Sequence, residues 1–242
     1  MRRLPFLLLP AVLVGLSVLV SCQPPPPPPP RPAPPAATSA EPVPESVDPQ
    51  VAQAARSDGL QGGTLLFRDD FERADLGPNW IVKHPDEWTI EGGLLRSHRV
   101  DPAESRNQGI WLQKPLPDKA RIVFQARSLS PSGDTKCEVF ATEQAHEAGY
   151  SIIFGGWNNT INTITRKGEH EPTRRVQSAH IPVEPQRTYT WTIVRTDNVV
   201  RWYVDGKFFL SYDDADAVRG QWFGFNNWLT DVRFDNLEVY AL

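Results

Sequence analysis

The chain has 242 residues, a formal net charge of −4 and eight tryptophans. A nucleic-acid-binding role is excluded, because the sequence has no basic cluster that could neutralise phosphates. With Cys22 and Cys137 as its two cysteines, and Cys22 expected to be modified, the domain must be stabilised by an apolar core rather than by a disulfide.

Residues 1–21 have the pattern of an export signal: two arginines, an apolar run and a small residue before Cys22. The tetrapeptide of residues 19–22 (LVSC) resembles the lipobox of bacterial lipoproteins. That resemblance implies cleavage before Cys22 and lipidation of this residue, so that the protein is exported and anchored to the cell envelope. Gln23 resembles the outer-membrane sorting pattern, which implies the periplasmic face or the cell surface.

Residues 22–61 are expected to form a disordered linker after the lipidated cysteine. Seven consecutive prolines occupy positions 24–30, and proline, alanine, serine and glutamate dominate the rest. Such a composition buries too little apolar area to fold and favours extended polyproline II backbone.

Residues 62–242 read as one domain built from many short strands. Apolar stretches bounded by Gly, Asn and Asp recur at the spacing of all-β proteins, and no stretch shows a sustained helical period. The predicted strands are Thr64–Arg68, Asn79–Lys83, Glu87–Glu91, Leu94–His98, Gln108–Gln113, Lys119–Ser128, Thr135–Thr142, Gly149–Gly155, Thr160–Arg166, Arg187–Thr196, Val199–Val204 and Lys207–Tyr212, with further strands up to the C-terminus.

Alternation within these strands predicts which side chains face the core. In the strand that begins at Thr135, we expect Cys137, Val139 and Ala141 to point inward. Lys136, Glu138, Phe140 and Thr142 are then expected to point outward. Two half-buried sheets must cover each other, so the predicted fold is an all-β, antiparallel two-sheet β-sandwich of the jelly-roll type.

The dipeptide Asp205-Gly206 predicts a tight hairpin, since a type I′ turn needs positive φ at both central residues. A two-residue loop fixes the register of its strands. Tyr203 should therefore face Phe208, and Trp202 should face Phe209.

Several segments resemble the concanavalin A-like lectin/glucanase superfamily. Residues 67–71 (FRDDF) resemble its opening strand and residues 234–240 (FDNLEVY) its closing strand, as in family 16 glycoside hydrolases. Residues 202–207 (WYVDGK) resemble the laminin-G-like version. Residues 88–95 (WTIEGGLL) are similar to the DUF1080 group, some of which are 3-keto-disaccharide hydrolases.

The resemblance to family 16 implies two sites. One is a structural Ca²⁺ held near the chain ends by Asp70 and Asp235. The other is a catalytic strand of pattern E-x-D-x-x-E, onto which Glu138 and Glu143 map as the two glutamates. Phe140 stands where the middle aspartate belongs, and Glu143 needs a β-bulge to reach the groove.

Two aromatic and amide-rich loops predict a carbohydrate groove, because indole faces suit sugar C–H groups and amides or charged groups suit hydroxyls. Each of these residues has an ordinary structural role as an alternative: a core lid, a turn or a solvated loop. The candidate ligand-binding residues are Trp111, Arg127, Trp157, Asn158, Asn159, Arg166, Glu169, His170, Asn226, Asn227 and Trp228.

Three functions stay open from the sequence. The first is a membrane-anchored, monomeric protein whose domain binds a glycan. The second is a glycoside hydrolase of the family 16 or 3-keto-disaccharide type, and the third is a structural or adhesive envelope protein without catalysis.

Overall fold

A computed structural model describes residues 58–98, 106–178 and 181–242. The chain divides into the units Met1–Ser46 and Val47–Leu242, and every described residue belongs to the second. The predicted signal peptide, Cys22 and nearly all of the predicted linker lie outside the described residues. Among the residues described, no helix is long and apolar enough to span a membrane.

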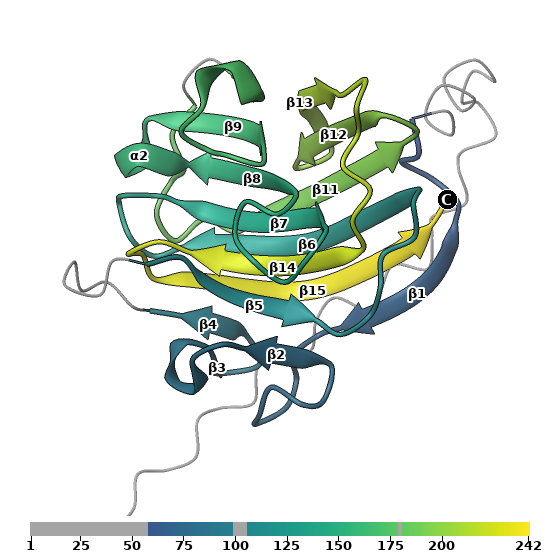
Figure 1. The fold of residues 1–242 in the computed structure, drawn as a ribbon. Helices are drawn as coiled ribbons and strands as arrows, with labels where there is room; N and C mark the ends of the chain where they lie inside the picture. Colours follow the sequence, from purple (N-terminus) through teal and green to yellow (C-terminus); the bar gives the residue numbers. More distant parts are fainter. Residues whose placement is uncertain (1–57, 99–105, 179–180) are drawn as a thin grey trace, which may run out of the picture. The chain divides into compact units, whose positions relative to one another are not determined.

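One sheet has eight antiparallel strands (Figure 1). From one edge to the other it contains β13 (Lys207–Asp213), β12 (Val199–Val204), β11 (Tyr189–Thr196), β6 (Ala120–Ser128), β15 (Val232–Ala241), β4 (Leu95–Ser97) and β3 (Thr89–Ile90), with β1 (Thr64–Asp69) also paired to β15.

The second sheet has seven antiparallel strands. Its order is β10 (Arg175–Gln177), β9 (Ile161–Arg166), β8 (Tyr150–Gly155), β7 (Thr135–Ala141), β14 (Trp222–Asn227), β5 (Gln108–Leu112) and β2 (Trp80–Val82). Helical segments in the described residues are single turns: η1 (Pro85–Glu87), α2 (Gly156–Asn159) and η3 (Pro172–Arg174). The predicted all-β sandwich is confirmed.

Aromatic side chains from both sheets fill the space between the layers. Phe124 of β6 contacts Phe225 of β14 with ring centroids 5.1 Å apart, and Phe225 stacks on Phe234 of β15 at 4.1 Å. All three are essentially buried. Cys137 is a buried free thiol in the same core, as its alternation predicted.

The two ends of the domain lie side by side. Strand β1 pairs with β15 from Thr64↔Ala241 to Asp69↔Leu237, and Figure 1 shows the blue first strand along the yellow last one. Asp70 follows the end of β1 and is exposed, and Asp235 lies at a bulge of β15, where β15 shifts register against β6. Calcium binding by this pair stays a prediction.

The Asp205-Gly206 hairpin forms as expected, with φ of 50° and 74°. Tyr203 pairs with Phe208, but the backbone partner of Trp202 is Leu210 rather than Phe209. The predicted aromatic contact still forms, since the ring centroids of Trp202 and Phe209 are 4.6 Å apart. A bulge between Trp202 and Tyr203 shifts the register by one residue. The two-residue turn therefore fixed the pairing next to it and not beyond the bulge.

Phe140 points inward, contrary to the outward orientation that simple alternation predicted. Its φ is 53°, and four residues of β7 (Glu138 to Ala141) lie opposite three of β14 (Trp222 to Gly224), so β7 carries a bulge here. The bulge reverses the alternation: Phe140 enters the main core, and Ala141 joins a cluster with Trp111 on the other face.

Candidate functional site

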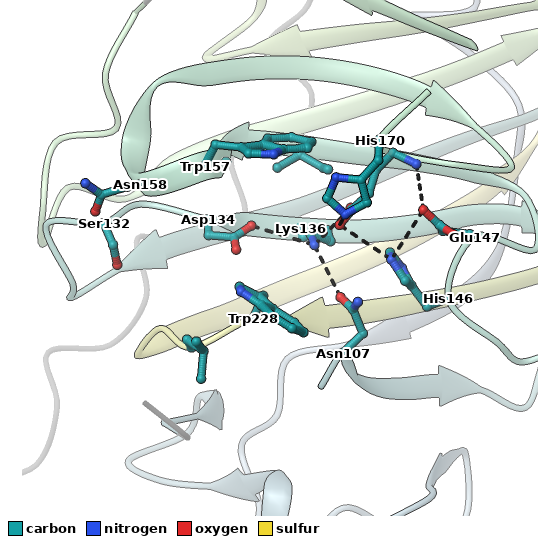
Figure 2. A pocket seen from close by; sticks show the side chains of 14 residues that line it. Asn107, Ser132, Asp134, Lys136, His146, Glu147, Trp157, Asn158, His170 and Trp228 are labelled. Atoms are coloured by element: carbon teal, nitrogen blue, oxygen red, sulfur yellow. Dashed lines mark hydrogen bonds and ion pairs between the residues drawn. The ribbon is translucent and has the colours of Figure 1, made fainter. Parts of the chain in front are cut away.

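A cavity of about 480 Å³ opens on the outer face of the seven-stranded sheet (Figure 2). Its floor comes from β7 and β8, and loops from both ends of neighbouring strands form its walls. The lining residues are Asn107, Ser132, Asp134, Lys136, His146, Glu147, Ile153, Gly156, Trp157, Asn158, Glu169, His170, Trp228 and Leu229.

Two indole rings border the cavity, and Figure 2 shows them on opposite sides of Lys136 and Asp134. Trp157 comes from α2, the single turn between β8 and β9, and Trp228 from the turn between β14 and β15. Trp228 is 36% exposed, which is unusual for a large apolar side chain. The arrangement offers two apolar faces that a ligand can reach.

The turn that carries each tryptophan is held by an asparagine within two residues of it in sequence. Asn159 donates from its amide to the carbonyls of Pro131 and Val183 and accepts from the Val183 N–H, so it fixes the α2 turn. Trp157 has a φ of 50° in that turn.

Asn227 is fully buried and holds the second turn. Its amide donates to Ser97 Oγ and to the Thr230 carbonyl, each at 2.8 Å. Asn159 and Asn227 therefore position the loops around the cavity and are not among the residues that line it.

Lys136 lies buried at the centre of the floor. Its Nζ is 3.1 Å from Glu169 Oε2, 3.3 Å from Asn107 Oδ1 and 3.8 Å from Asp134 Oδ1. Burial alone would lower the pKa of Lys136, but the carboxylates of Asp134 and Glu169 outweigh burial and raise it. Burial raises the pKa of Asp134 above its ordinary value, although Lys136 opposes the shift.

His146 lies at one end of the cavity, on the turn between β7 and β8, between two carboxylates. Its Nδ1 is 2.6 Å from Glu138 Oε1, and its Nε2 is 3.6 Å from Glu169 Oε1. Burial acts to lower the pKa of His146, yet the hydrogen bonds to Glu138 and Glu169 raise it to about 9. The pKa of Glu169, which burial would raise, falls to about 2 because of His146 and Lys136. Without another ligand, the imidazole is therefore charged at neutral pH.

Glu138 is completely buried beneath His146, on the face of β7 that it shares with Lys136. Besides the imidazole, it accepts hydrogen bonds from Ser151 Oγ (2.7 Å) and from the Asn226 amide (3.0 Å). Both of its oxygens are thus occupied, and it does not line the cavity. Glu138 and Asn226 support the site from below.

Glu143 is exposed in the turn after β7 and is not among the residues that line the cavity. The bulge that it needed is present at Phe140, but β7 ends at Ala141, before Glu143 could lie on the strand. The described structure therefore contains no contact that pairs Glu143 with Glu138, and the E-x-D-x-x-E pattern does not form a carboxylate pair at this cavity.

Five predicted ligand-binding residues line the cavity together: Trp157, Asn158, Glu169, His170 and Trp228. Three others lie outside this cavity. Arg166 is bound to Asp214 (2.7 Å) and Asp216. Trp111 is buried under Ala148 and Ala141, and Arg127 lies on β6 of the other sheet.

Sequence reasoning missed Asn107, Ser132, Asp134, Lys136, His146 and Glu147 as site residues. The alternation of β7 did place Lys136 and Glu138 on one face. Nothing in the sequence indicated that the turn containing His146 folds back over that face.

Comparison of the sequence with known protein families gave one partial match. The sequence model of a family described as "Farnesoic acid 0-methyl transferase" matches residues 136–239, less than half of the chain. No curated protein matches the chain.

Solved structures share the fold at low identity. A laminarinase from Flavobacterium sp. UMI-01 has a TM-score of 0.57 and 13% identity, covering 74% of this chain and 100% of that one. The carbohydrate binding module CBM66 from Bacillus subtilis has a TM-score of 0.50 and 14% identity, covering 67% and 96%. The laminarinase catalytic domain from Thermotoga maritima has a TM-score of 0.55 and 12% identity, covering 75% and 99%. The domain thus has the concanavalin A-like jelly-roll fold.

Proposed function

We propose that the domain binds carbohydrate in the cavity between Trp157 and Trp228. The observation that carries this proposal is the pair of accessible indoles on either side of a floor of charged and amide groups. Sugars present apolar C–H faces and a rim of hydroxyls, so they are recognised by aromatic platforms combined with a few fixed polar groups. Lys136, Asn107 and Asp134 supply donors and acceptors at the floor.

The charge of the lining also favours a sugar over a nucleotide or another phosphate-bearing ligand. Asp134, Glu147 and Glu169 make the cavity rich in carboxylates, which would repel a phosphate. Hydroxyl-rich neutral ligands are compatible with these acceptors. The structural relatives named above include carbohydrate-binding and carbohydrate-cleaving proteins, and a shared fold by itself leaves the ligand open.

The test is binding of the purified chain to a panel of immobilised polysaccharides and to a glycan array. Trp157→Ala and Trp228→Ala should each weaken retention about tenfold or more, since losing a buried aromatic contact removes about 1.5–3 kcal/mol. Phe208→Ala is the matched control, because Phe208 is a 60% exposed aromatic on the other sheet. Equal retention by all three variants would refute the proposed platform.

The same assay addresses hydrolysis. The imidazole of His146 and the carboxylates of Glu147 and Glu169 converge at one end of the cavity, within reach of a bound ligand. If a retained glycan is cut, new reducing ends will accumulate, and Glu169→Gln will stop their release. An intact glycan after prolonged incubation identifies the domain as a binding module.

The proposal includes a lipid anchor at Cys22, supported by the export pattern of residues 1–22. The expected location is the outer membrane, at its periplasmic face or at the cell surface. Labelled fatty acid should be incorporated into the wild-type chain, whereas Cys22→Ser should carry no label and leave the membrane fraction. Label that persists in Cys22→Ser would rule out this anchor.

A further inference from the structure

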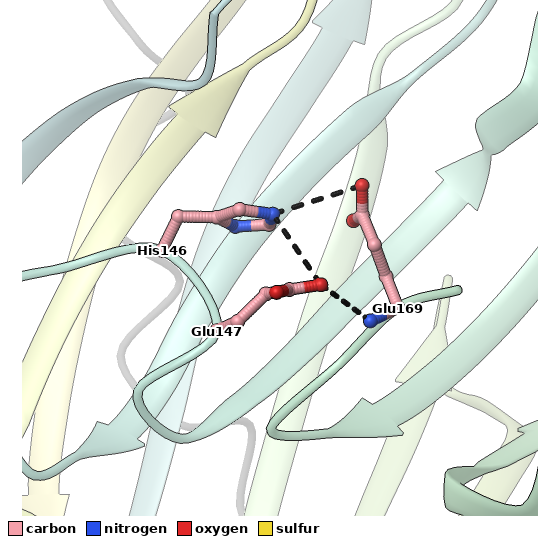
Figure 3. A group of neighbouring side chains, drawn as sticks. All are labelled: His146, Glu147 and Glu169. Carbon is pink, nitrogen blue, oxygen red and sulfur yellow. Dashed lines mark hydrogen bonds and ion pairs between the residues drawn. The ribbon is translucent and has the colours of Figure 1, made fainter. Parts of the chain in front are cut away.

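Three side chains at the end of the cavity present ligand atoms to one point. The group consists of His146, Glu147 and Glu169, and one nitrogen or oxygen from each lies within 4.8 Å of the others (Figure 3). His146 Nε2 is 3.6 Å from Glu169 Oε1 and 3.9 Å from Glu147 Oε1. The backbone N–H of Glu169 donates to Glu147 Oε1 at 2.6 Å and fixes that carboxylate. This spacing suits an ion placed between the three.

The imidazole is oriented in the way that metal sites orient histidine. Metal-binding histidines usually donate their second ring N–H to a carboxylate, which fixes the ring and increases its basicity as a ligand. Here the Nδ1–H of His146 donates to Glu138 Oε1 at 2.6 Å. Ser151 Oγ and the Asn226 amide also donate hydrogen bonds to Glu138 and fix its carboxylate. Nε2 is thereby directed toward the two glutamates.

The charge around this point also favours a cation. Four carboxylates, those of Asp134, Glu138, Glu147 and Glu169, surround Lys136 and His146. Asp134 lies beside Lys136 and outside the group of three. It is more than nine-tenths buried and lines the cavity, and its Oδ1 has no hydrogen-bond partner among the described residues, although Lys136 Nζ lies 3.8 Å away. A buried carboxylate oxygen without a hydrogen bond is costly unless a ligand satisfies it.

We propose that His146, Glu147 and Glu169 bind a divalent transition-metal ion of the Zn²⁺ or Mn²⁺ class, with Glu138 as the outer carboxylate that orients the histidine. An imidazole nitrogen with two carboxylates suits these ions, whereas Ca²⁺ requires six to eight oxygen ligands. Three protein ligands leave coordination positions open toward the cavity. Binding displaces the proton from Nε2, and this proton is released to solvent.

A metal ion at this point would extend the proposed function. This part of the proposal rests on that function, because it takes the ligand of the ion to be the bound carbohydrate. A metal with open positions can take two neighbouring sugar hydroxyls as ligands while the ring lies between Trp157 and Trp228. Retention of a glycan should therefore weaken when the chain is stripped with a chelator and recover when Zn²⁺ or Mn²⁺ is restored. Equal retention in both conditions would overturn this contact between ion and sugar.

The site itself is tested without any glycan, by titrating Zn²⁺ and Mn²⁺ into the chelator-stripped full chain in a calorimeter. We expect one equivalent to bind, with affinity at least about tenfold weaker in Glu147→Gln and Glu169→Gln and about 10–100-fold weaker in Glu138→Gln. Glu143→Gln is the matched control, since Glu143 lies in the same turn as Glu147 but outside the group. Circular dichroism checks that each variant is folded.

Three results would overturn the site: no binding by the wild type, equal affinity in Glu147→Gln and Glu143→Gln, or tighter binding of Ca²⁺ than of Zn²⁺ and Mn²⁺. Failure of the site and failure of the proposed function are distinguishable. Glycan retention by a chain that binds no metal would remove the metal site alone. One bound equivalent of Zn²⁺ in a chain that retains no glycan would remove the carbohydrate proposal alone.

Discussion

A single buried carboxylate, that of Glu138, connects the strand beneath the cavity to the chemistry above it. Its oxygens are shared among His146, Ser151 and Asn226, which come from three different segments. Buried charges of this kind are tolerated when paired and are strongly unfavourable when one partner is removed.

Glu138→Ala should therefore lower the free energy of unfolding of the metal-free protein by about 3 kcal/mol, because the variant leaves His146 and two buried donors without their acceptor. Urea denaturation in the presence of a chelator measures the change. Glu143→Ala, in the exposed turn, should stay within about 0.5 kcal/mol of the wild type. If Glu138→Ala changed the free energy of unfolding as little as Glu143→Ala, the network would contribute little to stability.

Residue chemistry alone predicted part of this network. The sequence indicated Glu169 as a residue of the cavity, which it lines. It indicated Glu138 as a catalytic carboxylate and Asn226 as a ligand contact, and the structure places both of these beneath the cavity. Their real positions depend on which side chain lies above which, and His146 covers Glu138 only because the β7–β8 turn folds back over the sheet. Spacing along the chain carries no information on such a contact.

At the scale of the strand, the bulge in β7 decides what faces the site. It sends Phe140 into the core and leaves Lys136 and Glu138 on the cavity side. Alternation predicted the first part of the strand correctly and failed at Phe140, since a non-glycine residue with positive φ has no clear sequence pattern.

Phe140→Ala should lower the free energy of unfolding by about 3–5 kcal/mol, the usual effect of emptying a buried phenylalanine site. The side chain is fully buried, and the Arg195 guanidinium lies 4.5 Å from its ring centroid. The exposed Phe208→Ala serves as the comparison in chemical denaturation. A loss for Phe140→Ala that is no greater than for Phe208→Ala would contradict the inward position of Phe140.

At the scale of the whole domain, stability in acid should depend on Asp69, at the end of β1. This carboxylate accepts hydrogen bonds from the Trp80 indole (2.7 Å), the Arg73 guanidinium and the Phe71 backbone N–H. Burial alone would raise the pKa of Asp69, but these bonds, with Arg73 the largest contributor, lower it below the ordinary value of 3.8.

A carboxyl whose pKa is lower in the folded than in the unfolded state stabilises the fold above the unfolded pKa. That contribution is lost as pH falls below about 3.8, since the folded state must then take up a proton that it binds weakly. Asp69→Asn should reduce the free energy of unfolding at neutral pH. Between about pH 4 and pH 2, that free energy should then decline less steeply than in the wild type. Thermal unfolding followed from neutral pH down to about pH 2 measures both, and Asp86→Asn, at an exposed position on η1, is the control. An unchanged slope in Asp69→Asn would refute the role of this carboxyl.

The whole fold was predictable where the site was not. Hydrophobic alternation, the Asp205-Gly206 turn and the aromatic excess each depend on neighbours close in sequence, and together they leave a two-sheet sandwich as the way to bury both faces. The cavity instead combines residues from Asn107 to Leu229, brought together by strand order. Strand β14 lies between β7 and β5, an order that the sequence does not reveal.

The pairing of Thr64 with Ala241 has a consequence for protein engineering. Partners on adjacent antiparallel strands have Cα atoms about 5 Å apart, so a short glycine-rich connection could join these two positions. New chain ends could then be opened at the exposed Asp205-Gly206 turn, on the sheet that does not carry the cavity. Such a circular permutant would present the binding face unaltered while its attachment point moved from β1 to the β12–β13 edge of the same sheet.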